Sequence, residues 1–202
     1  LLPTLVERGI RVVANAGGVN PLGCRDAVLD VARGAGLQGR ARIATVTGDD
    51  LLPRLPELLE RGVELKNMET GEPLGAVLER VQSANAYIGA RPIVEALAQG
   101  AHVVVTGRST DTALTYAPMI HEFGWSLEDY DRIAAGVVAG HVNECGAQAS
   151  GGNALHDWQT IPDLATVGYP IIEARADGSF AVTKHAGTGG RVSLQTVKEQ
   201  LV

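Results

Sequence analysis

The segment Ala101-His102-Val103-Val104-Val105-Thr106-Gly107 carries the strongest strand signal in the chain. A short apolar run of β-branched residues is typical of a strand that is buried on both faces of a parallel sheet. The same signature recurs at residues 10–16 and 41–47, and a helical pattern follows each of the three runs. This alternation predicts an α/β fold, a Rossmann-like layered domain with a largely parallel sheet and right-handed crossovers.

The segments between and after these strands have their own signals. Asn20 and Pro21 suit the cap and the first position of a helix, which we expect to run to about residue 33. The Asp177-Gly178 pair predicts a hairpin turn near the C-terminus. The remaining expected elements are helices at 50–61 (begun by Asp49 or Asp50), 74–82, 92–99, 111–123 and 127–149, short strands at 64–69 and 85–89, and hairpin strands at 171–176 and 180–184 followed by a Gly-rich loop.

Length and composition narrow the function classes. The 202 residues suit one α/β domain spanning 1–202, and the helical pattern at both ends suggests a piece of a longer protein. A formal charge of −6 argues against nucleic acid or an anionic membrane as the main partner. No apolar run approaches the roughly 18 residues that a membrane-spanning helix needs. Only two cysteines favour a reducing, cytoplasmic setting.

Two strand ends lead through glycine into polar residues. In α/β folds ligands bind at the carboxyl ends of strands, so residues 15–20 and 106–111 are expected to lie together, with 69–75 as a third candidate. Backbone N–H groups at a helix start attract anions, and an arginine can clamp one with two hydrogen bonds. The candidate substrate-binding residues here are Asn15, Gly17, Gly18, Asn20, Arg108 and Asp111. The alternative is a tight turn that needs glycine for backbone reasons, beside a solvated surface arginine.

The predicted helix 127–149 offers the candidates for proton transfer. It has no charged residue from Ile133 to Asn143, a pattern typical of a buried helix. Four polar residues, His141, Glu144, Cys145 and Gln148, then follow at i, i+3, i+4 and i+7 and would share one face. Three readings stay open. The first is a paired histidine and a cysteine filler in the core. The second is a catalytic group in which Glu144 or His141 transfers protons and Cys145 is the nucleophile, with Gln148 as a substrate-binding residue. The third is a metal site that takes further ligands from His121, Glu122 or His156. The spacing matches no common zinc site, so no metal ligand is assigned.

Basic residues and glycines gather once more before the last helix. Residues 183–193 contain Lys184, His185 and Arg191 around Gly187, Gly189 and Gly190. Such a segment suits a phosphate-bearing ligand such as a coenzyme A thioester, and we take Lys184, Gly189 and Gly190 as substrate-binding candidates. A mobile surface loop is the alternative.

These segments together resemble the acyclic terpene utilisation protein family. The matching stretches span nearly the whole chain: Asn15-Ala16-Gly17-Gly18-Val19-Asn20-Pro21, Gly107-Arg108 with Asp111, Ile120-His121-Glu122-Phe123-Gly124-Trp125, Ala139-Gly140-His141, Glu144-Cys145-Gly146-Ala147-Gln148, Gly151-Gly152, Gly187-Thr188-Gly189-Gly190, Val192-Ser193 and Thr196-Val197-Lys198-Glu199-Gln200-Leu201. The resemblance implies a role in the catabolism of acyclic isoprenoids such as citronellol and geraniol, whose acids are degraded as coenzyme A thioesters. It also implies a lyase-type step on a branched hydroxyacyl-CoA.

We therefore expect an enzyme that acts on a branched acyl-CoA or related carboxylate, by C–C cleavage or hydration. In this hypothesis Arg108 and Lys184 hold anionic groups, the glycine loops donate N–H groups, and Glu144 and His141 move protons. No cofactor is expected, with coenzyme A entering as part of the substrate. The other partner expected is a second copy of the chain or its flanking segments. The alternative function is a non-catalytic subunit that presents acyl-CoA to a partner such as a carboxylase.

Overall fold

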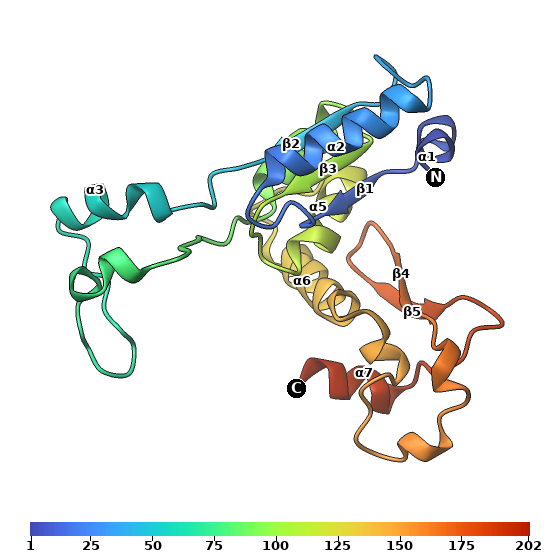
Figure 1. The fold of residues 1–202 in the computed structure, drawn as a ribbon. Coiled ribbons are helices and arrows are strands. Elements are labelled where there is room, and N and C mark those ends of the chain that lie inside the picture. The colour runs from blue at the N-terminus through green and yellow to red at the C-terminus, as the bar shows by residue number, and fades with distance from the viewer. The chain divides into compact units, whose positions relative to one another are not determined.

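The computed structural model describes residues 1–202, which form two compact units. The first unit comprises residues 1–88 with 102–109, and the second comprises 89–101 with 110–202. Together they hold seven α-helices, a three-stranded parallel sheet and an antiparallel hairpin (Figure 1). The α/β class is therefore confirmed, while the finer Rossmann-like layering stays a prediction.

The first unit is organised around its parallel sheet. The strands are β1 (Val12–Ala14), β2 (Ile43–Val46) and β3 (Val103–Thr106), in the order β1-β3-β2. Val103 is in register with both Val12 and Ile43, so the strands run level across the sheet. All four residues of the central strand β3 are buried, as its unbroken apolar sequence predicted.

Two helices complete this core. Helix α1 (Leu2–Arg8) ends at Gly9, which takes the left-handed conformation, and buries Leu2 and Leu5. Helix α2 (Pro21–Gly34) begins as predicted, since the Asn20 side chain accepts a hydrogen bond of 2.9 Å from the Gly23 N–H. A cluster of buried apolar side chains joins these helices to the sheet. Its members are Leu2, Leu5, Ala32, Leu37, Ala41, Val103 and Val105.

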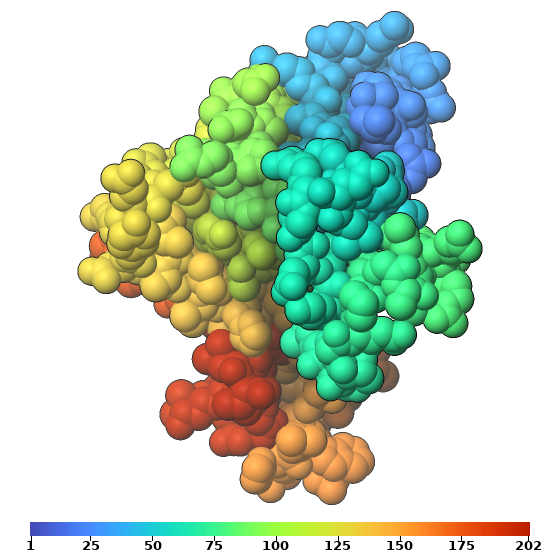
Figure 2. Space-filling view, turned by 90° about the vertical axis from the view of Figure 1, so that its left-hand side faces the viewer, coloured from blue at the N-terminus to red at the C-terminus, as the bar shows by residue number.

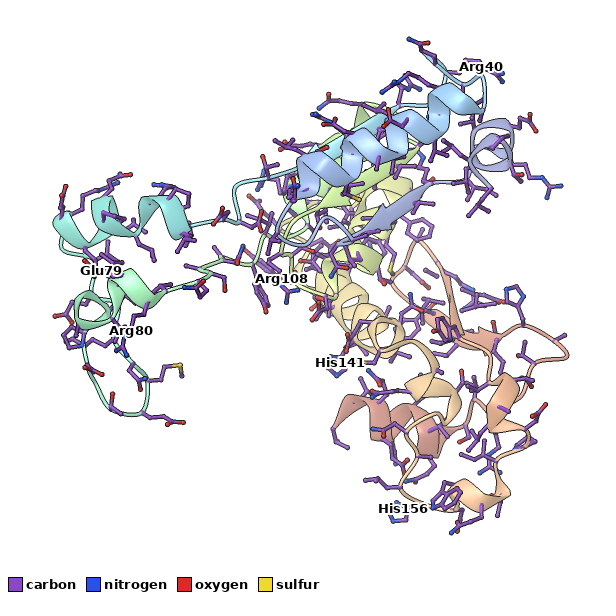
Figure 3. All side chains as sticks on the ribbon, viewed as in Figure 1. Arg40, Glu79, Arg80, Arg108, His141 and His156 are labelled. Atoms are coloured by element: carbon purple, nitrogen blue, oxygen red, sulfur yellow. The ribbon has the colours of Figure 1, made fainter.

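Residues 50–85 form an excursion whose two ends pair at Asp50 and Asn85. It contains the 3-10 turn η1 (Leu52–Arg54), helix α3 (Leu55–Glu60), and the 3-10 turns η2 (Leu74–Ala76) and η3 (Leu78–Arg80); Figure 3 labels Glu79 and Arg80 in the last of these. The expected helix at 74–82 and strands at 64–69 and 85–89 were wrong. Only isolated bridges join Lys66 to Pro73 and Ile88 to Ser109. Near the first of these bridges, the Asn67 side chain accepts hydrogen bonds from the amides of Glu69 and Thr70 and turns the chain. The 69–75 candidate segment therefore follows no strand of the sheet.

The second unit is built mainly from helices. They are α4 (Arg91–Ala98), α5 (Ala113–Phe123), α6 (Tyr130–Glu144) and α7 (Leu194–Leu201). Helices α5 and α6 pack closely: a Cβ on Gly140 would lie 2.6 Å from the Thr112 carbonyl oxygen, and one on Gly136 would lie 2.7 Å from Tyr116 Cβ. The small residues of α6 thus allow the approach, as their pattern indicated.

Helix α6 differs from its prediction in length and in burial. It covers 130–144 rather than 127–149. The 3-10 turn η4 (Gly146–Ser150) follows, and its first residue, Gly146, has a φ of 56°. It is also not buried all round, since Val138 is 43% exposed and His141 lies at the surface. An uncharged sequence was a poor guide here, because small and aliphatic residues also occupy solvent-facing positions.

The hairpin is confirmed. Strands β4 (Pro170–Ala174) and β5 (Phe180–Lys184) pair antiparallel with Pro170 opposite Lys184, and the turn contains Gly178 at φ 93°. Two further 3-10 turns, η5 (Trp158–Thr160) and η6 (Leu164–Thr166), lie in the loop before it. The indole N–H of Trp125 donates to the Ala176 carbonyl at 2.8 Å and ties the hairpin turn to the end of α5.

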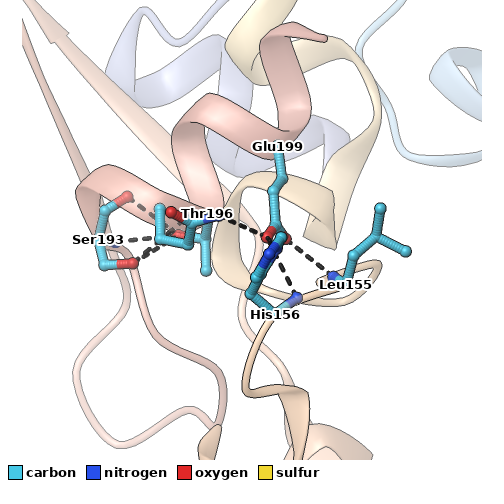
Figure 4. A network of polar contacts seen from close by, with 6 residues as sticks. Leu155, His156, Ser193, Thr196 and Glu199 are labelled. Carbon is cyan, nitrogen blue, oxygen red and sulfur yellow. Dashed lines mark hydrogen bonds and ion pairs between the residues drawn. The ribbon is translucent and has the colours of Figure 1, made fainter.

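Helix α7 is fastened at two points (Figure 4). Ser193 and Thr196 form a reciprocal capping box at its start. The Glu199 carboxylate accepts hydrogen bonds from the Leu155 and His156 amides, at 2.9 and 3.2 Å, and contacts His156 Nδ1 at 3.1 Å. These bonds hold the loop after η4 against α7, and in Figure 2 the red helix lies beside this orange segment.

Candidate functional site

The carboxyl edge of the sheet brings together two predicted segments within the first unit. A Cβ on Gly17 would lie 2.5 Å from the Thr106 carbonyl oxygen, so the turn after β1 touches the end of β3 and requires glycine. The amides of Gly18 and Asn20 donate to Asn15 and Gly17 within the same turn, at 3.1 and 2.8 Å. These two donors therefore shape the turn, and a role for them in anion binding stays a prediction.

Asp49 is a member of this edge that the sequence analysis missed. Instead of starting a helix, it is 3% exposed, and its Oδ2 accepts from the Arg108 amide at 2.8 Å and from Asn85 Nδ2 at 3.0 Å. A Cβ on Gly107 would overlap with this carboxylate. Its position just after β2, at the edge where the parallel strands end, was the signal that could have found it.

Arg108, which is labelled in Figure 3, lies at the same edge and contacts Tyr87. Its Nη2 donates to the Tyr87 hydroxyl at 2.9 Å, and its guanidinium carbon lies 5.1 Å from the centre of the tyrosine ring. The ring thus orients the guanidinium by a hydrogen bond and by a cation–π contact. Tyr87 was not among the predicted residues.

The second unit contains an open hollow of about 530 Å³ at the C-terminal end of α6. Three predicted site residues, Glu144, Cys145 and Gln148, line it. The other lining residues were not among the predicted site residues: Gly146, Ala147, Gly152, Asn153 and Tyr169. The helix ends before Gln148, so this residue reaches the hollow from η4 and not from the predicted common helix face. Tyr169 arrives from the loop before β4 and packs on Gly146, where no side chain intervenes.

A thiol–carboxylate pair marks this hollow. Cys145 Sγ donates to Glu144 Oε1 at 2.6 Å, and both residues are exposed. The largest effect on the pKa of the Cys145 thiol is this hydrogen bond, which raises it. Partial removal from solvent is the second cause, and the negative charges of Glu144 and Asp111 raise the pKa further. The pair is therefore a carboxylate next to a thiol that keeps its proton, an arrangement suited to accepting one proton and supplying another.

His141 is tied to α7. Its Nε2 lies 3.1 Å from the Gln200 carbonyl oxygen, and Gln200 Nε2 donates to the His141 carbonyl at 2.8 Å. The Gln200 side chain also lowers the pKa of Cys145 through a hydrogen bond, against the larger effect of Glu144. Its own Oε1 is buried without a hydrogen-bond partner. Gln200 thus connects His141 with Cys145, a link that no local spacing indicates.

The Gly-rich segment before α7 is used within the fold. Lys184 Nζ donates to the Thr188 carbonyl at 2.7 Å. The amides of Gly189 and Gly190 donate to the carbonyls of Thr166 and Pro162, at 2.9 and 2.7 Å. These groups close the loop after β5, and a Cβ on Gly189 would overlap with the backbone. Their predicted contact with substrate phosphate remains a prediction.

No group of three or more His, Cys, Asp and Glu side chains is placed to hold a metal ion. None of the helices combines the length and the apolarity that crossing a membrane requires.

Comparisons with known proteins place the chain. No curated protein and no solved structure matches it. One family model, described as "Acyclic terpene utilisation family protein AtuA", matches residues 1–202. Since this match covers the whole sequence, the chain belongs to the acyclic terpene utilisation family.

Proposed function

We propose that this protein is an enzyme of acyclic isoprenoid catabolism that acts on a branched acyl-CoA, or the related carboxylate, by acid/base chemistry at Glu144. The observation that carries the proposal is the Glu144–Cys145 pair in the open hollow of the second unit. Membership of the acyclic terpene utilisation family supports the substrate class.

The chemistry needs one proton acceptor and one proton donor. In C–C cleavage of a branched hydroxyacyl thioester, the Glu144 carboxylate removes the hydroxyl proton, and the C–C bond breaks to give a ketone and an enolate. In hydration, the carboxylate takes a proton from water as its oxygen adds to the double bond of an enoyl thioester. Both reactions end when the carbon next to the thioester carbonyl gains a proton, and in this proposal the Cys145 thiol beside Glu144 supplies it.

Deuterium incorporation tests this proposal for both reactions at once. The full-length protein is incubated in D₂O with the coenzyme A thioesters of geranic acid and of its hydrated derivative. We expect products that carry deuterium at the carbon next to the thioester carbonyl, with either the added mass of water or two smaller fragments by mass spectrometry. Glu144→Gln should lower the rate about 10²–10⁴-fold, while the surface variant Glu128→Gln should react like the wild type.

The opposite outcome is equally informative. Binding of these thioesters without deuterium uptake or product would contradict the enzymatic proposal and support the alternative, a subunit that presents acyl-CoA to a partner. Full activity of Glu144→Gln would show that the proton acceptor lies elsewhere.

A further inference from the structure

A second hollow, of about 400 Å³, lies among α5, α6 and β4 of the second unit. Its size falls in the range of small-molecule sites. Seven of its nine lining residues are apolar: Leu114, Pro118, Met119, Pro170, Ile171, Ile172 and Ala174. The α5 and β4 side chains thus supply the apolar part of its lining.

The two polar lining residues are bonded to each other. Asn143 Nδ2 donates to Thr115 Oγ1 at 3.3 Å and bridges α6 to α5. The pairing reduces the demand of these groups for water or for a polar ligand. A lining of this kind favours an aliphatic group, because water gains little from contact with it.

This apolar hollow borders the one that holds the thiol–carboxylate pair. Asn143 lines the first and Glu144 the second, and likewise Pro170 lines the first and Tyr169 the second. Each pair is joined by one peptide bond, so the two hollows share backbone at the end of α6 and at the start of β4. The apolar hollow is thus next to the one at Glu144.

We propose that the hollow among α5, α6 and β4 is the subsite for the aliphatic chain of the acyl substrate. The proposal rests on the proposed function, since it takes Glu144 as the reacting end. It assigns chain-length selectivity to Leu114 and Ala174, which line this hollow and not the one that holds the thiol–carboxylate pair.

A series of unreactive ligands tests the subsite. Butanoyl-, hexanoyl- and octanoyl-CoA have neither the hydroxyl group nor the double bond that the reaction needs, so calorimetry with the wild-type protein measures binding alone. A methylene group transferred from water to an apolar site contributes about 0.8 kcal/mol, so affinity should rise about fourfold for each methylene that enters the hollow.

Two variants should remove this dependence in different ways. Ala174→Phe fills the hollow, and Leu114→Asn makes its wall polar, so in both the affinity should become nearly independent of chain length while coenzyme A itself binds as before. Leu194→Asn is the matched control, because Leu194 is 74% exposed on α7 and outside the hollow. Melting temperatures identify a variant that is misfolded, and the other variant then decides.

Equal affinity of the wild type for all three thioesters would overturn the proposal. The same result is expected if another part of the assembled protein covers the hollow, and it overturns the proposal in that case too. Retention of the chain-length dependence by a folded Leu114→Asn or Ala174→Phe variant would overturn it as well. Because these ligands do not react, the result is separate from the deuterium test. A chain-length effect without turnover supports the subsite and contradicts the proposal that the protein is an enzyme. Turnover without a chain-length effect supports the enzymatic proposal and contradicts the subsite.

Discussion

Cys145 combines exposure with a suppressed tendency to ionise. Its sulfur reaches solvent, yet the hydrogen bond to Glu144 raises the pKa of its thiol. The thiolate is the nucleophilic form of cysteine, so this environment disfavours Cys145 as a nucleophile and favours it as a proton or hydrogen-bond donor. A serine at position 145 can replace that donor, so Cys145→Ser should retain function. If Cys145 were a nucleophile, the same substitution would not be tolerated.

Alkylation of Cys145 by iodoacetamide measures this effect. Near neutral pH the reaction should be slow in the wild type and faster in Glu144→Gln, because the neutral amide no longer opposes formation of the thiolate. The pH at which the rate reaches half its maximum should move down in the variant. The rate is followed by mass spectrometry of the peptide that contains Cys145, and the peptide with Cys24 is the internal control. Identical pH–rate profiles would show that Glu144 does not control the thiol.

At the scale of the element, the turn between β1 and α2 separates two roles of glycine. Gly17 has no room for a side chain, since its Cβ would lie 2.5 Å from a carbonyl oxygen at the end of β3. Gly18 has open space around it, but its φ is 50°, where other residues are strained. The first glycine thus serves the contact between two strand ends, and the second serves the local chain reversal.

The two glycines should respond differently to alanine. Gly17→Ala should cost about 3 kcal/mol, because backbone atoms must move, whereas Gly18→Ala should cost about 1 kcal/mol of backbone strain. At about 2–4 °C per kcal/mol for a chain of this size, thermal unfolding followed by circular dichroism resolves the two. A Gly17→Ala variant with the melting temperature of the wild type would contradict the close approach of the two strand ends.

At the scale of the whole molecule, the Glu199 contacts make stability depend on pH. The hydrogen bond from Gln195 and then that from the Leu155 amide lower the pKa of Glu199 from 4.5 to about 2. A carboxyl group whose pKa is lower in the folded state than in the unfolded chain stabilises the fold at pH values above its pKa in the unfolded chain. That contribution is lost as the pH falls through the folded value.

We therefore expect the melting temperature of Glu199→Gln to lie below that of the wild type at pH 6. The difference should be constant well above pH 4.5, should shrink as the pH falls from there towards 2, and should disappear only below the folded pKa of about 2. Asp177, whose pKa is also lowered by hydrogen bonds from Ser179, acts in the same direction and is present in both proteins, so it cancels in the difference. A difference that does not shrink between pH 4.5 and pH 2 would mean that Glu199 acts through packing and not through its charge.

Local sequence determined those parts of the protein whose signal lies within a few residues. The buried strand β3, the start of α2 at Asn20, the hairpin around Gly178 and the α/β class belong here, because capping, turn and apolar patterns act over short distances. The hydrogen bond between Glu144 and Cys145 does not belong here, because neighbouring side chains of a helix do not face each other and this pair forms where α6 ends.

The tertiary structure decided what depends on distant partners. Three contacts each join segments that are separate in the sequence: that of Asp49 with Gly107 and the Arg108 amide, that of Gln200 with His141, and that of Tyr169 with Gly146. Such contacts form only when the helices and strands have packed, and the polar groups then pair with whatever lies within reach. The physical reason is that a buried polar group must find a partner in space, and no periodicity along the chain records which one it finds.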